Sequence, residues 1–238
     1  MARDVQMSTL PAALPELPGY DLCGTFRPAE ITGGDTFDLA ELEQGLLIVL
    51  GDATGHGIAP ALSVTQMQAM LRIAFRLGAD LDSAFLQVNN RLAETLPPDR
   101  FVTAFIGLLD LQTHRLQFHS GGQAPILHYQ AASRSCRSYK PTSFPLGAMP
   151  IVRVKPAVSV DLLPGDALIL LSDGFFEYGN AGGEQFGEER VRAIVEAHHG
   201  RTATALLDCV LQGLDAFAGG ASQEDDMTAV LVRRAALA

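Results

Sequence analysis

Acidic residues stand beside apolar runs at four places in the sequence, where each could take part in chemistry. These are Asp35 after Gly33-Gly34, Asp52 after LLIVLG, Asp173 after ALILLS, and Asp225-Asp226 before MTAVLV. If the adjoining strands end at a common edge, three or four carboxylates converge there. Converging carboxylates repel one another, and a buried unpaired charge is costly, so a divalent cation would relieve the site. An all-oxygen donor set without Cys or His at metal spacing favours Mg²⁺ or Mn²⁺ over zinc.

Each of these motifs has a plainer explanation when it is taken alone. An Asp-Gly pair after a strand usually marks a turn, and Asp225-Asp226 could be a charge pair in a loop. The stretch Gly33-Gly34-Asp35 is also close to the signature loop of diguanylate cyclases. However, Thr36 stands where a cyclase needs a second acid, and 32 residues before Gly33 are too few for its upstream elements. The prediction of a metal site therefore depends on the joint pattern.

Apolar runs and periodicities predict the elements that would position these acids. Continuous apolar runs at residues 46–50, 103–109, 167–171 and 228–232 predict strands buried on both faces. Residues 115–118 and 125–129 flank the turn-rich SGGQA and predict a hairpin. Helical spacing predicts helices over 64–74, over 85–96 with Asp82 as N-cap, near 191–195, and over 206–217 between Thr202 and Gly219.

The order of these elements predicts the fold class. Strands, two helices, strands, two helices and a final strand do not alternate as in a doubly wound parallel sheet. Strands that are buried on both faces fit two stacked sheets with helices outside them. The sequence therefore predicts an α+β protein with a four-layer α-β-β-α sandwich.

Composition excludes several classes of protein. The formal net charge of −10 argues against nucleic-acid binding. No apolar run approaches the ~20 residues of a membrane span. Three widely spaced cysteines indicate neither disulfides nor zinc, which fits a cytoplasmic location. Three prolines and little apolar surface predict that residues 1–18 form a mobile arm or linker before one catalytic domain, residues 19–238.

The motifs, taken in order, resemble the bacterial PPM-type (PP2C-like) serine/threonine protein phosphatases of the SpoIIE/RsbU class. The matching pieces are Arg27-Pro28-Ala29 leading to GGDTFD, then GDATGHG, PTSFPLGAMP, LLPGDALILLSDGFFEYGN, FGEER and EDDMTAVLVRR. The resemblance implies the PP2C-like sandwich of two mainly antiparallel sheets and a site for two Mn²⁺ or Mg²⁺ ions. It matches Asp35, Asp52, Asp173 and Asp225 to the metal-binding aspartates, with Asp52 bridging. The carbonyl of Ala53 matches a contact to the second metal.

The same resemblance implies the activity, which is hydrolysis of phosphoserine or phosphothreonine on a protein by a metal-activated water. It implies a phosphorylated protein substrate of the anti-anti-sigma (STAS) kind, and an upstream sensor domain or activating partner. Arg27 is a candidate phosphate-binding residue and His56 a candidate general acid, while Gln123 replaces a histidine that is common in the class. Asp226 is not counted as a ligand, and Asp38 has no assigned role. The alternative is a non-catalytic PP2C-like regulatory or sensor module.

Overall fold

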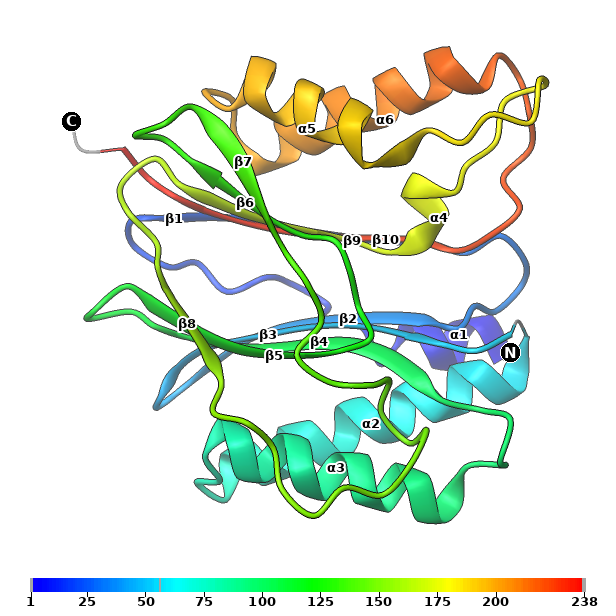
Figure 1. Cartoon of the computed structure of the whole chain (residues 1–238), viewed down its shortest axis with the longest axis vertical. Coiled ribbons are helices and arrows are strands. Elements are labelled where there is room, and N and C mark those ends of the chain that lie inside the picture. The colour runs from blue at the N-terminus through cyan, green and yellow to red at the C-terminus, as the bar shows by residue number, and fades with distance from the viewer. Residues whose placement is uncertain (1, 56, 237–238) are drawn as a thin grey trace.

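Two five-stranded sheets lie face to face in the computed structural model, which describes residues 2–55 and 57–236 (Figure 1). The first sheet has the order β1 (Tyr20–Arg27), β10 (Met227–Arg234), β9 (Ala167–Leu171), β6 (Ile126–Gln130) and β7 (Ser135–Tyr139). The second has the order β2 (Asp35–Leu42), β3 (Gly45–Ala53), β4 (Val102–Asp110), β5 (Arg115–Gly121) and β8 (Val158–Asp161). Neighbouring strands in both sheets are antiparallel.

Helices cover the outer face of each sheet. The helices α5 (Gly187–His198) and α6 (Ala203–Ala218) lie on the first sheet, and α2 (Ile58–Arg76) and α3 (Leu81–Thr95) lie on the second (Figure 1). Two short helices, α1 (Ala2–Met7) and α4 (Asp173–Phe176), complete the set among the described residues. The predicted four-layer sandwich is confirmed.

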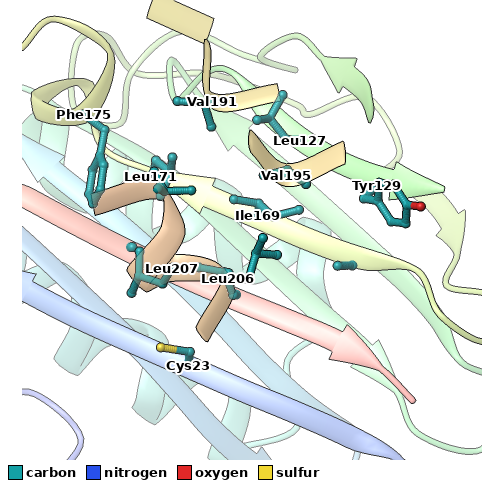
Figure 2. Close-up of a cluster of buried hydrophobic side chains, with 14 of the residues drawn as sticks. Cys23, Leu127, Tyr129, Ile169, Leu171, Phe175, Val191, Val195, Leu206 and Leu207 are labelled. Atoms are coloured by element: carbon teal, nitrogen blue, oxygen red, sulfur yellow. The ribbon is translucent and has the colours of Figure 1, made fainter. Parts of the chain in front are cut away.

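Three layers of core explain why the central strands are continuously apolar. Successive side chains of a strand point to opposite faces. On β3, Ile48 and Leu50 therefore enter the core between the sheets, and Leu47 and Val49 pack against α2 and α3. On the first sheet, apolar side chains of β6 and β9 pack under α5 and α6 (Figure 2).

The predicted hairpin around SGGQA is wrong. β5 pairs with β4 and β8 in the second sheet, whereas β6 pairs with β7 and β9 in the first. The glycine-rich stretch carries the chain from one sheet to the other, and backbone hydrogen bonds join Ser120 and Gly122 to residues 142–143. Turn-forming residues therefore indicate a reversal of the chain without specifying which sheet the next strand joins.

The helix ends were predicted in part. Thr202 caps α6 through a hydrogen bond from the Ala205 amide, and Gly219 ends it in the left-handed conformation, as predicted. At α3 the predicted cap was wrong, because Asp80 rather than Asp82 accepts the hydrogen bond from the Ser83 amide. Asp82 lies in the first turn of α3, where its Oδ1 atom contacts His119 Nε2 at 2.8 Å.

The N-terminal segment is attached to the sandwich. After α1, residues 8–18 form no helix or strand, which agrees with the predicted extended arm. Leu17 is 7% exposed, and Leu10 and Leu14 pack against the core between the sheets. The expectation that this segment has little to bury is therefore wrong. Within the described residues, no helix has the length and apolar character needed to cross a bilayer.

Candidate metal centre

Asp35 and Asp52 face each other across the β2–β3 hairpin. Antiparallel pairing sets the first residue of β2 against the next-to-last residue of β3, so these two carboxylates come from directly opposed positions. Asp35 is 1% exposed, and its Oδ2 atom has no hydrogen-bond partner within the described residues. A buried carboxylate oxygen without a donor is costly and indicates a position where a cation fits.

The first sheet brings the other two acids to the same edge. Asp173 begins α4 two residues after the end of β9, and Asp225 stands two residues before β10, the strand paired with β9. A Cβ atom on Gly174 would overlap the carbonyl oxygen of Asp226, so the two segments touch backbone to backbone. This contact requires glycine at position 174 and keeps Asp173 beside Asp225.

Raised pKa values indicate that the carboxylates from the two sheets lie close enough to repel one another. Burial, together with the charges of Asp173 and Asp225, raises the pKa of Asp52 to about 7. Burial and the charges of Asp225 and Glu177 raise the pKa of Asp173 to about 6. Burial and the Asp52 charge raise the pKa of Asp35 well above its ordinary value. The edge therefore concentrates more negative charge than it neutralises.

Asp226 shapes the loop before Asp35, a role that sequence reasoning missed. Its carboxylate accepts hydrogen bonds from the amides of Gly34 at 2.6 Å and Ala29 at 2.8 Å. A Cβ atom on Gly33 would overlap this carboxylate, and one on Gly34 would lie 2.6 Å from the Ala53 carbonyl oxygen. The pair Gly33-Gly34 is thus the one signal in the sequence that the Asp226 side chain and the Ala53 backbone pack closely against this loop.

Comparisons with known proteins agree with this architecture. The family model for Stage II sporulation protein E (SpoIIE) matches residues 43–235. The chain belongs to the SpoIIE family.

Relatives of this SpoIIE-family chain include Protein IcfG of Synechocystis sp., which is 26% identical over 98% of the chain, and the phosphoserine phosphatase RsbU of Bacillus subtilis, which is 21% identical over 98%. The chain spans 40% of the length of IcfG and 69% of the length of RsbU.

Solved structures show the same fold. The SiaA-PP2C domain of Pseudomonas aeruginosa has a TM-score of 0.82 at 23% identity, covering 98% of this chain and 93% of that one. The RsbU and RsbW domains of a Mycobacterium tuberculosis protein have a TM-score of 0.80 at 25% identity, covering 97% of this chain and 64% of that one. The fold of this SpoIIE-family protein is therefore that of PP2C phosphatase domains.

The remaining candidate residues lie in different places. Arg27 ends β1 opposite Met227, so it is on the acidic edge, and its side chain is exposed. His56 lies outside the described residues. Asp38 is fully buried, but its carboxylate pairs with Arg72 of α2 and does not belong to the acidic cluster.

Two glutamines support the segments that carry the acids, and neither was singled out for this from the sequence. Gln6 of α1 donates to the Gly33 carbonyl at 2.7 Å and accepts from the Gly33 amide at 3.0 Å. Gln123 donates to the Leu171 carbonyl at 2.9 Å, two residues before Asp173. Gln123, which replaces a histidine common in the class, thus makes a buried structural contact in this protein.

The acidic cluster fits hydrated cations. Among the described residues, no three His, Cys, Asp or Glu side chains stand close enough to surround a single ion. Mg²⁺ keeps several waters and is commonly held by one or two carboxylates, so pairs of acids suffice. A polar hollow of about 830 Å³, lined by Glu177, Tyr178, Asn180 and Asp225 among others, opens beside the cluster.

Proposed function

We propose that the protein is a metal-dependent serine/threonine protein phosphatase. The observation that carries the proposal is the gathering of Asp35, Asp52, Asp173 and Asp225 from both sheets at one edge. Membership of the SpoIIE family supports it, and so does the relative RsbU, which is named a phosphoserine phosphatase.

In this proposal the four aspartates and the Ala53 carbonyl would hold two Mn²⁺ or Mg²⁺ ions, and Asp52 would serve both. Bound ions of this kind supply a hydroxide nucleophile near neutral pH and neutralise phosphoryl charge. Gly33 and Gly34 let the backbone approach closely, and Arg27 orients the phosphate at the end of β1. Burial raises the pKa of the Cys136 thiol to about 12 and also raises the pKa of Cys23, which disfavours either thiolate as a nucleophile.

The proposed substrate is a phosphoserine or phosphothreonine on a protein, of the anti-anti-sigma (STAS) kind that the class resemblance implies. An upstream sensor domain or an activating partner is part of the same proposal. The chain spans less than half of IcfG, so such a domain would belong to the remainder of a longer relative.

The experiment is release of inorganic phosphate from a phosphoserine peptide in the presence of Mn²⁺, Mg²⁺ or EDTA. The proposal expects release that depends on the cation and is abolished by EDTA. A protein that binds the cation and releases no phosphate would instead be the non-catalytic module.

A further inference from the structure

Positive charge is unevenly distributed in this acidic chain. Residues 111–160 contain six of the 17 Lys and Arg residues and none of the 27 Asp and Glu residues. Both lysines of the protein, Lys140 and Lys155, are among the six. A segment of 50 residues without one acid contrasts with a formal net charge of −10, so a distinct basic surface is expected where it folds.

Part of this segment forms a hollow on the outside of the second sheet. The connection from β7 to β8 runs from the first sheet across the second and over α3 (Figure 1). Hydrogen bonds with Asn90 and Asp82 of α3 fix residues 151 and 157 on this path. Residues 141–144 and 151–155 of this connection enclose a hollow of about 430 Å³, here called the basic hollow. It is lined by Thr142, Ser143, Phe144, Arg153, Val154 and Lys155 among others.

The basic hollow offers both charge and an apolar anchor. Arg153 and Lys155 are exposed, and neither forms an ion pair with another described residue. The Phe144 side chain is 65% exposed. Exposed aromatic and arginine side chains side by side are typical of the residues that dominate protein–protein interfaces.

The hollow also lies close to the candidate metal centre. Leu146 pairs with Val102 at the start of β4, and Val102 pairs with Ala53 at the end of β3. Two strand spacings separate Leu146 from Ala53, which is about 10 Å. Phe144 stands two residues before Leu146 in the chain, so about four or five extended residues would span from the acidic edge into the hollow.

We propose that the basic hollow binds an acidic segment of the phosphoprotein substrate, with Arg153 and Lys155 facing its carboxylates and Phe144 contacting an apolar neighbour. This inference rests on the proposed function. A protein segment fits better than a nucleic acid, because a continuous polyanion would also meet the repelling carboxylates of the metal centre. A short acidic tract can remain within the hollow while the phosphorylated residue lies at the edge.

The test uses phosphoserine peptides with four glutamates placed about five residues before or after the phosphoserine, and matched peptides with glutamines. We expect the wild-type protein with Mn²⁺ to prefer one of the glutamate peptides by about tenfold in kcat/KM at low salt, and less at high salt. The double variant Arg153→Gln/Lys155→Gln should reduce this preference below about twofold. Its hydrolysis of p-nitrophenyl phosphate should stay unchanged, which also shows that it folds.

A control variant separates the hollow from overall charge. Arg76→Gln/Arg201→Gln removes the same charge from exposed side chains on α2 and before α6, and should keep the preference. Equal wild-type rates on glutamate and glutamine peptides, or a preference that survives in Arg153→Gln/Lys155→Gln, would overturn the docking inference alone. Failure to hydrolyse any peptide or p-nitrophenyl phosphate would overturn the proposed function, and the inference with it.

Discussion

Asp52 is the residue at which charge from both sheets meets, so its replacement should separate catalysis from folding. In Asp52→Asn we expect more than a tenfold loss of phosphate release, because the shared ligand of the proposed metal pair is removed. The metal-free fold should be stabilised by about 1–2 kcal/mol, since one of several repelling carboxylates is gone. Phosphate release with Mn²⁺ and urea unfolding in EDTA measure the two effects.

A variant that kept more than about a tenth of wild-type turnover, equivalent to ~1.4 kcal/mol of barrier, would refute the bridging role. Unfolding of the Asp52→Asn protein would indicate that this carboxylate serves the structure instead.

Gly33 should be intolerant of any side chain. In Gly33→Ala the new methyl group would overlap the Asp226 carboxylate, which holds the amides of Gly34 and Ala29. We expect a loss of about 1–3 kcal/mol in the free energy of unfolding, together with reduced activity, because the loop before Asp35 must move. The matched control is Gly200→Ala, where the added Cβ meets nothing within 4 Å. Equal melting temperatures for the two variants would contradict the prediction.

The sequence identified the acids of the candidate site but not the residues that hold them. Asp35, Asp52, Asp173 and Asp225 stand beside apolar runs, so local pattern and family motif reach them. The contacts of Gln6, Gln123 and Asp226 join positions 27, 48 and 192 residues apart in the chain. No local pattern in the sequence encodes such pairs, because they form only where the fold brings distant segments together.

Among the secondary structure elements, α2 is attached to β2 by an ion pair between the half-buried Arg72 and the fully buried Asp38. The guanidinium of Arg72 binds both carboxylate oxygens of Asp38, which is fully buried. In Arg72→Met the Asp38 charge would be left unpaired, and we expect a loss of about 2–4 kcal/mol in the free energy of unfolding. The double variant Asp38→Val/Arg72→Met should recover more than half of that loss.

Urea unfolding of both single variants and of the double variant provides this measurement as a double-mutant cycle. Additive losses would mean that the two side chains do not stabilise one another.

Elements were predictable where burial leaves a regular pattern. The core strands β3, β4, β9 and β10 are apolar on both faces, and α2, α3, α5 and α6 each carry a buried stripe. By contrast, β1, β7 and β8 are only partly buried, so they give no continuous apolar run. The false hairpin between β5 and β6 arose because two sheets are stacked, and a short turn can lead into either one.

Across the whole molecule, convergence of the two sheets should make the metal-free protein sensitive to pH. The folded pKa values of Asp52 and Asp173, about 7 and about 6, lie above the ~3.9 of an unfolded aspartate. The folded state therefore binds more protons between about pH 4 and 7, so its stability is greatest below that range and is lost as the pH rises through it. Urea unfolding in EDTA at pH 5 and pH 8 should give the higher free energy at pH 5. A flat or rising profile would show that the acids do not repel as described.

The N-terminal arm contacts two segments near the candidate metal centre, which are the loop before Asp35 and helix α2. Gln6 forms two hydrogen bonds with Gly33, two residues before Asp35, and the Thr9 carbonyl accepts a hydrogen bond from Gln68 of α2. In Gln6→Ala both bonds to Gly33 would be lost, leaving the loop free to shift relative to Asp226.

We expect this change to lower turnover by about fivefold and to raise the Mn²⁺ concentration at half-maximal activity, because each buried hydrogen bond contributes about 1 kcal/mol to holding the loop. The matched control is Gln66→Ala. It removes an exposed hydrogen bond from Gln66 of α2 to the Thr95 hydroxyl of α3. If Gln6→Ala and Gln66→Ala share the wild-type rate and Mn²⁺ midpoint, the arm is a passive tether. A change confined to Gln6→Ala would instead show that the arm influences the site.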